Sequence, residues 1–235
     1  MRIVGLLSFY DEKPGWLAAA VASMAPFADH VVAVDGAYAA YPGGRARSPV
    51  GQSEAICDTA RACQVGCTVY EPQTVWAGGE VAKRAFMFRL AEAITTPDDW
   101  YFVLDADEVV SEVGLDVPAT LVATEHDAAQ VTCWQHRGHY EPQERPFVTD
   151  LVEQQQLRKF FRAIPGLTVA VNHYTYILPD GRHLWGHGVP LEPAEGMAEL
   201  KVEHHTKGRD LWRANQSRCY YERRDEQQLE RQEVA

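Results

Sequence analysis

The sequence lacks the features that would place it among membrane, secreted or zinc-ribbon proteins. Its longest mostly apolar stretch, 16–28, contains a serine and a proline and falls short of the roughly 20 apolar residues that a membrane-spanning helix requires. The short apolar run 3–7 is followed by acidic residues, without the longer apolar segment and cleavage site of a signal peptide. The cysteines are odd in number and form no C-x-x-C pair: Cys57, Cys63, Cys67, Cys133 and Cys219. We therefore expect a soluble, cytoplasmic protein with reduced thiols and no membrane partner.

Basic residues are also few. Lys and Arg total 22 against 33 Asp and Glu, a formal net charge of −11, so the chain as a whole does not attract phosphate backbones. The basic stretch 158–162 is the exception. Duplex DNA is therefore a less expected partner than a protein or a saccharide. Hydrophobic residues make up 46% and charged residues 23% of the 235 residues, which are ordinary values for one folded domain.

Two hydrophobic periods alternate along the first hundred residues. Short apolar runs of the strand type occur at 3–8, 30–34, 67–70 and 100–104, and segments with helical spacing of apolar residues lie between them at 14–24, 53–62 and 80–94. This alternation is typical of crossover units, in which helices connect parallel strands. We therefore predict a mostly parallel sheet with helices packed on both faces.

The second half is less regular and favours a mixed sheet. Its pattern predicts a helix at 117–124, a strand at 129–134, short strands or a hairpin at 158–162 and 168–171 around Pro165-Gly166, a strand at 200–204 and a polar helix at 210–231. There is no internal repeat and no obvious linker. The predicted fold class is a single α/β domain over 1–235, Rossmann-like, with a mixed central sheet, helices on both faces and a C-terminal helix.

The strongest chemical signal is the run Asp105-Ala106-Asp107-Glu108, directly after the predicted strand 100–104. Ligands of parallel sheets collect at the carboxyl ends of the strands, so these carboxylates are expected to face a ligand crevice. Two Asp at this spacing can share one Mg²⁺ or Mn²⁺, which favours a few carboxylates supplemented by phosphate oxygens. A solvated acidic turn is the alternative interpretation, and the position after a buried strand favours the metal and diphosphate site.

Two further segments suit a nucleotide ligand. Asp35 ends the predicted strand 30–34, where its carboxylate can accept hydrogen bonds from a base or a ribose, although Asp35-Gly36 is equally a turn former. Gly78-Gly79 precede a predicted helix whose free amides attract anions, and Lys83 and Arg84 follow one turn later. The alternative is a simple glycine turn before a helix with solvated cations.

Histidine and cysteine supply other candidate metal ligands. His204 and His205 close the last predicted strand, and only one of two adjacent strand residues can point into a given site. Imidazole suits Mn²⁺ beside carboxylates, whereas a structural or surface role is expected for the other histidines. The spacing of the first three cysteines does not fit a zinc knuckle, so we expect small buried side chains there.

Three features together make the chain resemble glycosyltransferases of the A-type fold, in particular the short family-two-like enzymes of bacteria and phages. The segment from Leu6 to Glu12, followed by a helix and by Val31 to Gly36, is similar to the first strand, acidic loop and second strand of that family. Asp105 to Glu108 match its metal motif. Glu203-His204, followed by Arg209, Arg213 and Tyr220-Tyr221, is similar to its late histidine and basic helix.

The resemblance implies a metal-dependent enzyme that transfers a sugar from a UDP- or GDP-linked donor. It implies Asp35 at the base or ribose, Lys83 and Arg84 near the diphosphate, Asp105 at the ribose, and Asp107 and His204 on the metal, with Asp105 as a further metal ligand and His205 as the alternative to His204. Ser8, Tyr10, Glu12, Gly79 and Ala106 complete the implied donor site. The implied division is a nucleotide-sugar half at 1–110, an acceptor side at 111–206 and a helix at 207–235.

One departure from the family pattern leaves the general base open. Many inverting relatives carry a Glu-Asp pair in the acceptor half, and no such dipeptide occurs after residue 110. Asp150, Glu153 and Glu141 are candidates by position, Asp150 first. The acceptor, and whether the anomeric configuration is inverted or retained, also stay open.

Three other functions compete with this interpretation. A nucleotidyltransferase usually has a Gly-rich, basic loop after the first strand, whereas this chain has Asp11-Glu12 there. The other two are a metal-dependent hydrolase built on the histidines and a non-catalytic module that binds sugar nucleotides.

Overall fold

The computed structural model describes residues 1–114, 116–141, 145–170, 175–184, 188–190 and 200–204. Over 134–141, 145–155, 188–190, 201 and 203–204 it describes the backbone alone. The predicted helix 210–231, His205 and the residues that follow them lie outside these ranges.

The first half alternates strands and helices as predicted. The elements are β1 (Ile3–Ser8), α1 (Pro14–Met24), β2 (His30–Val34), α2 (Gln52–Ala62), β3 (Gly66–Tyr70), α3 (Gly79–Glu92) and β4 (Trp100–Asp105). Each lies within two residues of its predicted bounds. Pro14 presets the backbone of the first turn of α1, and the buried residues Leu17, Ala20, Val21 and Met24 recur at helical spacing.

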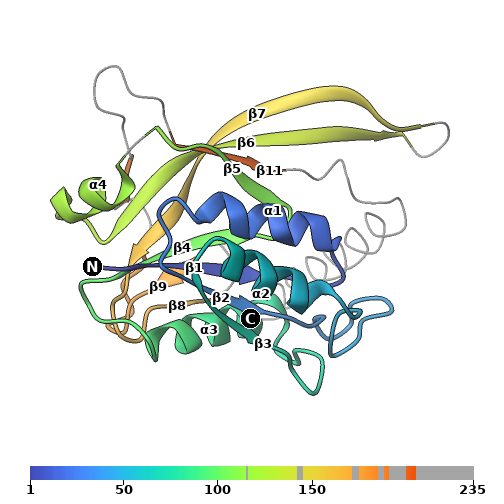
Figure 1. The fold of residues 1–235 in the computed structure, drawn as a ribbon, viewed down its shortest axis with the longest axis horizontal. Helices are drawn as coiled ribbons and strands as arrows, with labels where there is room; N and C mark the ends of the chain where they lie inside the picture. Colours follow the sequence, from blue (N-terminus) through green and yellow to red (C-terminus); the bar gives the residue numbers. More distant parts are fainter. Residues whose placement is uncertain (115, 142–144, 171–174, 185–187, 191–199, 205–235) are drawn as a thin grey trace, which may run out of the picture.

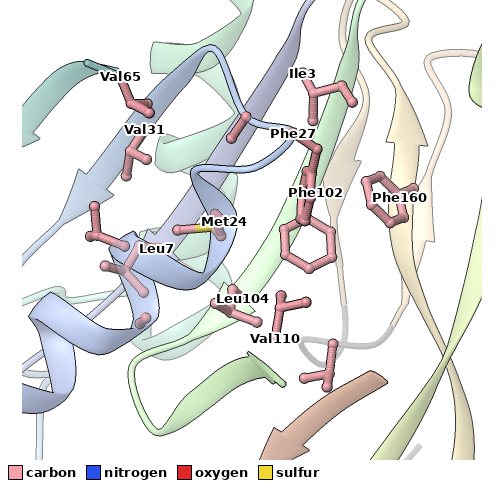
Figure 2. Packing of buried hydrophobic residues seen from close by; sticks show 14 of the residues in the cluster. Ile3, Leu7, Met24, Phe27, Val31, Val65, Phe102, Leu104, Val110 and Phe160 are labelled. Carbon is pink, nitrogen blue, oxygen red and sulfur yellow. The ribbon is translucent and has the colours of Figure 1, made fainter. Parts of the chain in front are cut away.

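The four strands of this half are parallel, in the order β3-β2-β1-β4. Successive residues of β1 serve opposite faces of the sheet: Ile3 and Leu7 pack with α1 and α2, whereas Val4 and Leu6 pack with α3. Figure 1 shows α1 and α2 on one side of these strands and α3 on the other. Figure 2 shows the first of these cores, where Met24 of α1 meets Leu7 and Val31. Helices on both faces are therefore confirmed.

The second half adds antiparallel pairs to the same sheet. β6 (Ala128–Glu141) and β7 (Arg145–Arg162) form a long hairpin, and β7 pairs antiparallel with β4 through Phe102 and Phe160. β11 (Lys201–His204) lies parallel to β6 and antiparallel to β5 (Glu108–Glu112), and β10 (Gly188–Pro190) pairs with β6. Nine of the eleven described strands thus form one mixed sheet, as the fold class predicted.

Several details of this half differ from the sequence prediction. β5 was not expected, and the predicted strand 129–134 is the start of the much longer β6. The hairpin partner of β7 is β6, not the segment after Pro165-Gly166. The two short strands that follow this dipeptide, β8 (Thr168–Val169) and β9 (Tyr176–Ile177), pair with each other. The predicted helix at 117–124 is present as α4 (Val117–Ala123). Asp116 caps its N-terminus, and the Asp116 carboxylate accepts a hydrogen bond from the Ala119 amide.

Among the described residues, the helices are too short or too polar to cross a lipid bilayer.

Candidate functional site

The candidate site lies where the strand order of the parallel half reverses. The chain moves from β1 outward to β2 and β3, and then returns to the other edge of β1 with β4. Ser8, at the carboxyl end of β1, stands opposite Val34 on one side and Asp105 on the other. In open α/β sheets a ligand crevice forms at such a reversal, at the carboxyl ends of the strands. The predicted residues Ser8, Asp35 and Asp105 therefore share one edge of the sheet.

Asp35 is buried and anchors the loop that follows β2. Its Oδ1 accepts hydrogen bonds from the Gly36 amide (2.6 Å) and the Ser48 hydroxyl (2.5 Å), and its Oδ2 accepts the Ser48 amide (2.7 Å). The backbone turns at Gly36 with φ +103°, and a Cβ there would lie 2.6 Å from the Ala46 carbonyl oxygen. Of the two roles considered for Asp35, the contacts are those of the turn former.

Lys83 is also buried, and its ammonium joins the ends of two strands. Nζ donates to the backbone oxygens of Phe9 (2.6 Å) and Gly36 (2.9 Å) and lies over the Tyr38 ring. Gly79, with φ +67°, donates its amide to the Trp76 carbonyl (3.0 Å). The glycine turn and Lys83 thus hold the loop after β2 against the carboxyl ends of β1 and β2.

The segment after β1 borders the same loop. Ser8 and Glu12 are buried, and the Glu12 amide donates to the Gln52 side chain at 3.0 Å. The Tyr10 hydroxyl accepts the Arg45 amide at 2.8 Å, and the Tyr10 ring packs edge-on against Tyr41. Ser8 thus ends β1 at this edge of the sheet, and Tyr10 and Glu12 lie in the segment that follows it.

Arg84 is the predicted cation that contacts the acidic motif. Its guanidinium donates to Asp105 Oδ1 (2.5 Å) and to Glu80 Oε1 (3.3 Å), and its side chain is 6% exposed. Burial alone lowers the pKa of Arg84, but the carboxylates of Asp105 and Glu80 outweigh it and raise the pKa well above its ordinary value. Arg84 therefore stays charged and fixes the orientation of Asp105.

A second buried ion pair involves Glu108, the last residue of the motif. Lys159 Nζ of β7 contacts Glu108 Oε2 at 2.5 Å, and the same oxygen accepts the backbone amide of Asp105 at 2.8 Å. Burial alone lowers the pKa of Lys159, but the carboxylates of Glu108 and Asp105 raise it above its ordinary value. This arrangement closes the turn between β4 and β5 and holds the backbone of Asp105.

The sequence interpretation missed the roles of Glu80, Glu108 and Lys159. The lysine directly before Phe160-Phe161 in a predicted strand was a usable signal, because a lysine that is buried in a sheet is almost always paired. The basic stretch 158–162 was instead considered for nucleic-acid contact.

Asp107 and Ala106 are both 5% exposed. The pKa of the nearby Cys133 thiol is raised to about 12, chiefly by burial and then by Glu108, with Asp105 and Asp107 adding to the effect. Three carboxylates of the motif thus act on one buried thiol, which places them close together. The thiol itself stays neutral at pH 7.

His204 lies beside the motif in the sheet. Its backbone stands opposite Glu108 in the antiparallel pairing of β11 with β5, one residue from Asp107. His205 lies outside the described residues. The pairing therefore brings the backbone of His204, the favoured histidine, next to the acidic turn.

The structure does not bring Asp150 to this edge. Asp150 stands opposite Gly138 in the β6–β7 hairpin, and nine residues of strand separate it from Lys159, about 30 Å along β7. Figure 1 shows the hairpin extending beyond the rest of the sheet. Glu153 and Glu141 lie on the same hairpin.

The cysteines do not form a metal site in the part of the chain that is described. Cys57, Cys63 and Cys67 are half-buried rather than fully buried, and Cys133 is buried. Burial, followed by the neighbouring Cys57 thiol, raises the pKa of Cys67 to about 12, whereas metals bind thiolates. Over the described side chains, no three His, Cys, Asp or Glu are grouped so that they could hold a metal ion.

No family model matches the chain, and no curated protein matches it. The chemistry open to the site follows from its own residues. Carboxylates at the end of β4, held by buried cations beside the end of β1, suit a divalent cation completed by phosphate oxygens of a ligand.

Proposed function

We propose that this protein is a metal-dependent glycosyltransferase with the A-type fold, which moves a sugar from a UDP- or GDP-linked donor to an acceptor hydroxyl. One observation carries the proposal: Asp105 and Asp107 come directly at the carboxyl end of β4, beside the end of β1, where the strand order reverses. Edges of this kind commonly bind nucleotides, so a nucleoside diphosphate suits this one. An acceptor of protein or saccharide type fits the acidic chain better than duplex DNA.

The residues present fit a divalent cation. Four carboxylates, Glu80, Asp105, Asp107 and Glu108, gather around the turn with three basic described side chains, Arg84, Lys159 and the half-buried Arg158. Mg²⁺ and Mn²⁺ commonly use one or two protein carboxylates and take their other ligands from phosphate and water, so a three-ligand protein cage is not required.

In this proposal Asp107 and His204 hold the cation, with Asp105 as a further ligand. The bound cation would neutralise charge on the departing nucleoside diphosphate. Arg84 holds the Asp105 carboxylate in place through an ion pair, and the Lys159–Glu108 pair fixes the Asp105 backbone. Because these groups are already bonded before substrate arrives, little reorganisation is needed when charge develops.

The loop after β2 supplies the nucleotide side of the site. Asp35, Lys83 and Trp76 hold this loop against the sheet, the last through its indole N–H on the Asp35 carbonyl (2.8 Å). Asp35 acts in this proposal by shaping the base and ribose pocket, and Ser8, Tyr10 and Glu12 border it. The base that deprotonates the acceptor is unassigned.

A screen of UDP- and GDP-sugars with Mn²⁺, read by mass spectrometry, tests the proposal. Hydrolysis of the donor by water releases a nucleoside diphosphate and a free sugar, whereas transfer releases a nucleoside diphosphate and joins the sugar to the acceptor oxygen. A nucleotidyltransferase, assayed in parallel with UTP or GTP and a sugar phosphate, releases pyrophosphate instead. We expect nucleoside diphosphate release by the parent and its loss in Asp107→Asn. Asp58→Asn, at an exposed site on α2, is the matched control and should act like the parent. Equal release by Asp107→Asn, or release of pyrophosphate instead, would contradict the proposal.

A further inference from the structure

A cavity of about 100 Å³ lies between α3, β4, β7 and β9, against the candidate site. Its polar lining consists of Arg84, Asp105, Gln156, Arg158, Lys159 and Tyr176. One water takes roughly 30 Å³ in the liquid, so the cavity has room for a group of several atoms. Its lining includes Asp105 of the acidic motif and Arg84, which is paired with it, so whatever the cavity binds lies beside the proposed site of transfer.

The lining is strongly basic for a chain with an acidic net charge. Three basic residues and one acidic residue line the cavity. Two of the cations are already bonded to carboxylates, Arg84 to Glu80 and Asp105, and Lys159 to Glu108. Arg158 is the third.

Arg158 differs from the other two in its bonding. Its Nε is buried and has no hydrogen-bond partner among the described residues. A buried donor of a charged group that stays unsatisfied is destabilising, and a guanidinium is best satisfied by an oxyanion, which accepts two of its N–H groups at once. A neutral sugar hydroxyl would satisfy the donor but would leave the charge unmatched.

We infer that this cavity binds a small oxyanion, a carboxylate or phosphate group carried by one of the sugar substrates, with Arg158 as the residue that selects it. The assignment to a substrate rests on the proposed function, whereas the binding of an anion rests on the cavity alone. The anionic group belongs either to the donor sugar or to the acceptor, and the two sources give different binding results.

The test is a binding comparison of anionic and neutral sugars. Glucuronic acid, glucose 6-phosphate and glucose are titrated by ligand-observed NMR, and UDP-glucuronic acid and UDP-glucose by calorimetry with Mn²⁺. The variants are Arg158→Gln, which removes the charge, and Arg158→Lys, which keeps it. Arg182→Gln is the control, because Arg182 is an exposed arginine on a turn outside the cavity. Urea unfolding of each variant establishes that it is folded.

We expect at least one anionic sugar to bind the parent about tenfold or more tightly than its neutral counterpart, a factor expected for a hydrogen bond to a charged group. Arg158→Gln should lose this preference, Arg158→Lys should keep part of it, and Arg182→Gln should keep it all. A preference seen only in the UDP-linked pair assigns the anion to the donor. A preference among free sugars that persists with UDP bound assigns it to the acceptor.

Equal binding of anionic and neutral sugars to the parent would overturn the inference, as would an unchanged preference in folded Arg158→Gln. The same titrations separate this failure from failure of the proposed function. A parent that binds UDP with Mn²⁺ but shows no anion preference refutes the cavity assignment alone. A parent that prefers anionic sugars, loses the preference in Arg158→Gln and does not bind UDP or GDP retains the anion site and refutes the glycosyltransferase.

Discussion

Replacement of Lys159 by Met should destabilise the protein severely, because it leaves the Glu108 carboxylate buried without its cation. The two side chains are only 6% and 4% exposed, and their atoms are 2.5 Å apart. Removal of one partner of a buried ion pair costs about 3–5 kcal/mol. Since domains of this kind are stable by about 5–15 kcal/mol, Lys159→Met should lose a large share of the total.

Urea unfolding at pH 7, followed by tryptophan fluorescence, measures this loss. The double variant Lys159→Met/Glu108→Gln should be more stable than Lys159→Met, because glutamine is neutral and still accepts the Asp105 amide. Arg61→Met, at an exposed pair with Asp58, should change the free energy of unfolding by less than about 1 kcal/mol. A loss below about 1 kcal/mol in Lys159→Met, or no recovery in the double variant, would refute the assignment of this pair as buried and mutually compensating.

Two further predictions concern the loop at the site and the opposite end of the same strands. Gly36→Ala should destabilise the protein by more than about 2 kcal/mol, because it combines a strained φ of +103° with a Cβ 2.6 Å from a backbone oxygen. Gly51→Ala is the control for backbone strain alone, because Gly51 has φ +99° and no neighbour within 4 Å. Equal losses of stability in urea for the two variants would show that the clash at Gly36 is absent. Burial alone raises the pKa of Asp99, but hydrogen bonds from Thr96 and Arg2 outweigh it and lower the pKa. The stability advantage of the parent over Asp99→Asn should therefore be full above about pH 4 and shrink as the pH falls through the lowered pKa; an advantage that grows in acid would contradict this.

The first half of the fold was predictable because three of its four strands are buried along nearly their whole length. β1, β2 and β4 are continuous apolar runs, and α1 repeats its buried residues at helical spacing, so the period identifies each element without tertiary information. The carboxyl end of β4 could be located in the same way, which is why Asp105 was placed correctly at the edge of the sheet.

The second half was harder because its strands are not apolar along their whole length. The sequence of β6 turns polar after Trp134, although its backbone pairing with β7 continues to Glu141. β5 carries Glu at both ends and gives no strand signal beside the acidic motif. Backbone hydrogen bonds between the strands, which do not depend on whether a side chain is polar or apolar, hold these segments in the sheet.

The partners of the site residues could not be predicted from local sequence. The Lys83 ammonium reaches Gly36, 47 residues away, and Lys159 reaches Glu108 across 51 residues. Such contacts depend on how the loop after β2 folds and on which strand lies beside β4. The residue types therefore indicated a phosphate and metal site. They did not indicate which basic side chains are already bonded to other protein groups.

Calorimetric titration of UDP and GDP against the parent and Asp107→Asn, with Mn²⁺ and after chelation, tests whether the acidic motif binds a cation and a diphosphate together. We expect a nucleoside diphosphate to bind the parent only when Mn²⁺ is present, and Asp107→Asn to weaken this binding by at least about tenfold, a loss seen even for residues one step removed from a metal. Binding that is the same with and without Mn²⁺, or the same in Asp107→Asn as in the parent, would contradict this expectation.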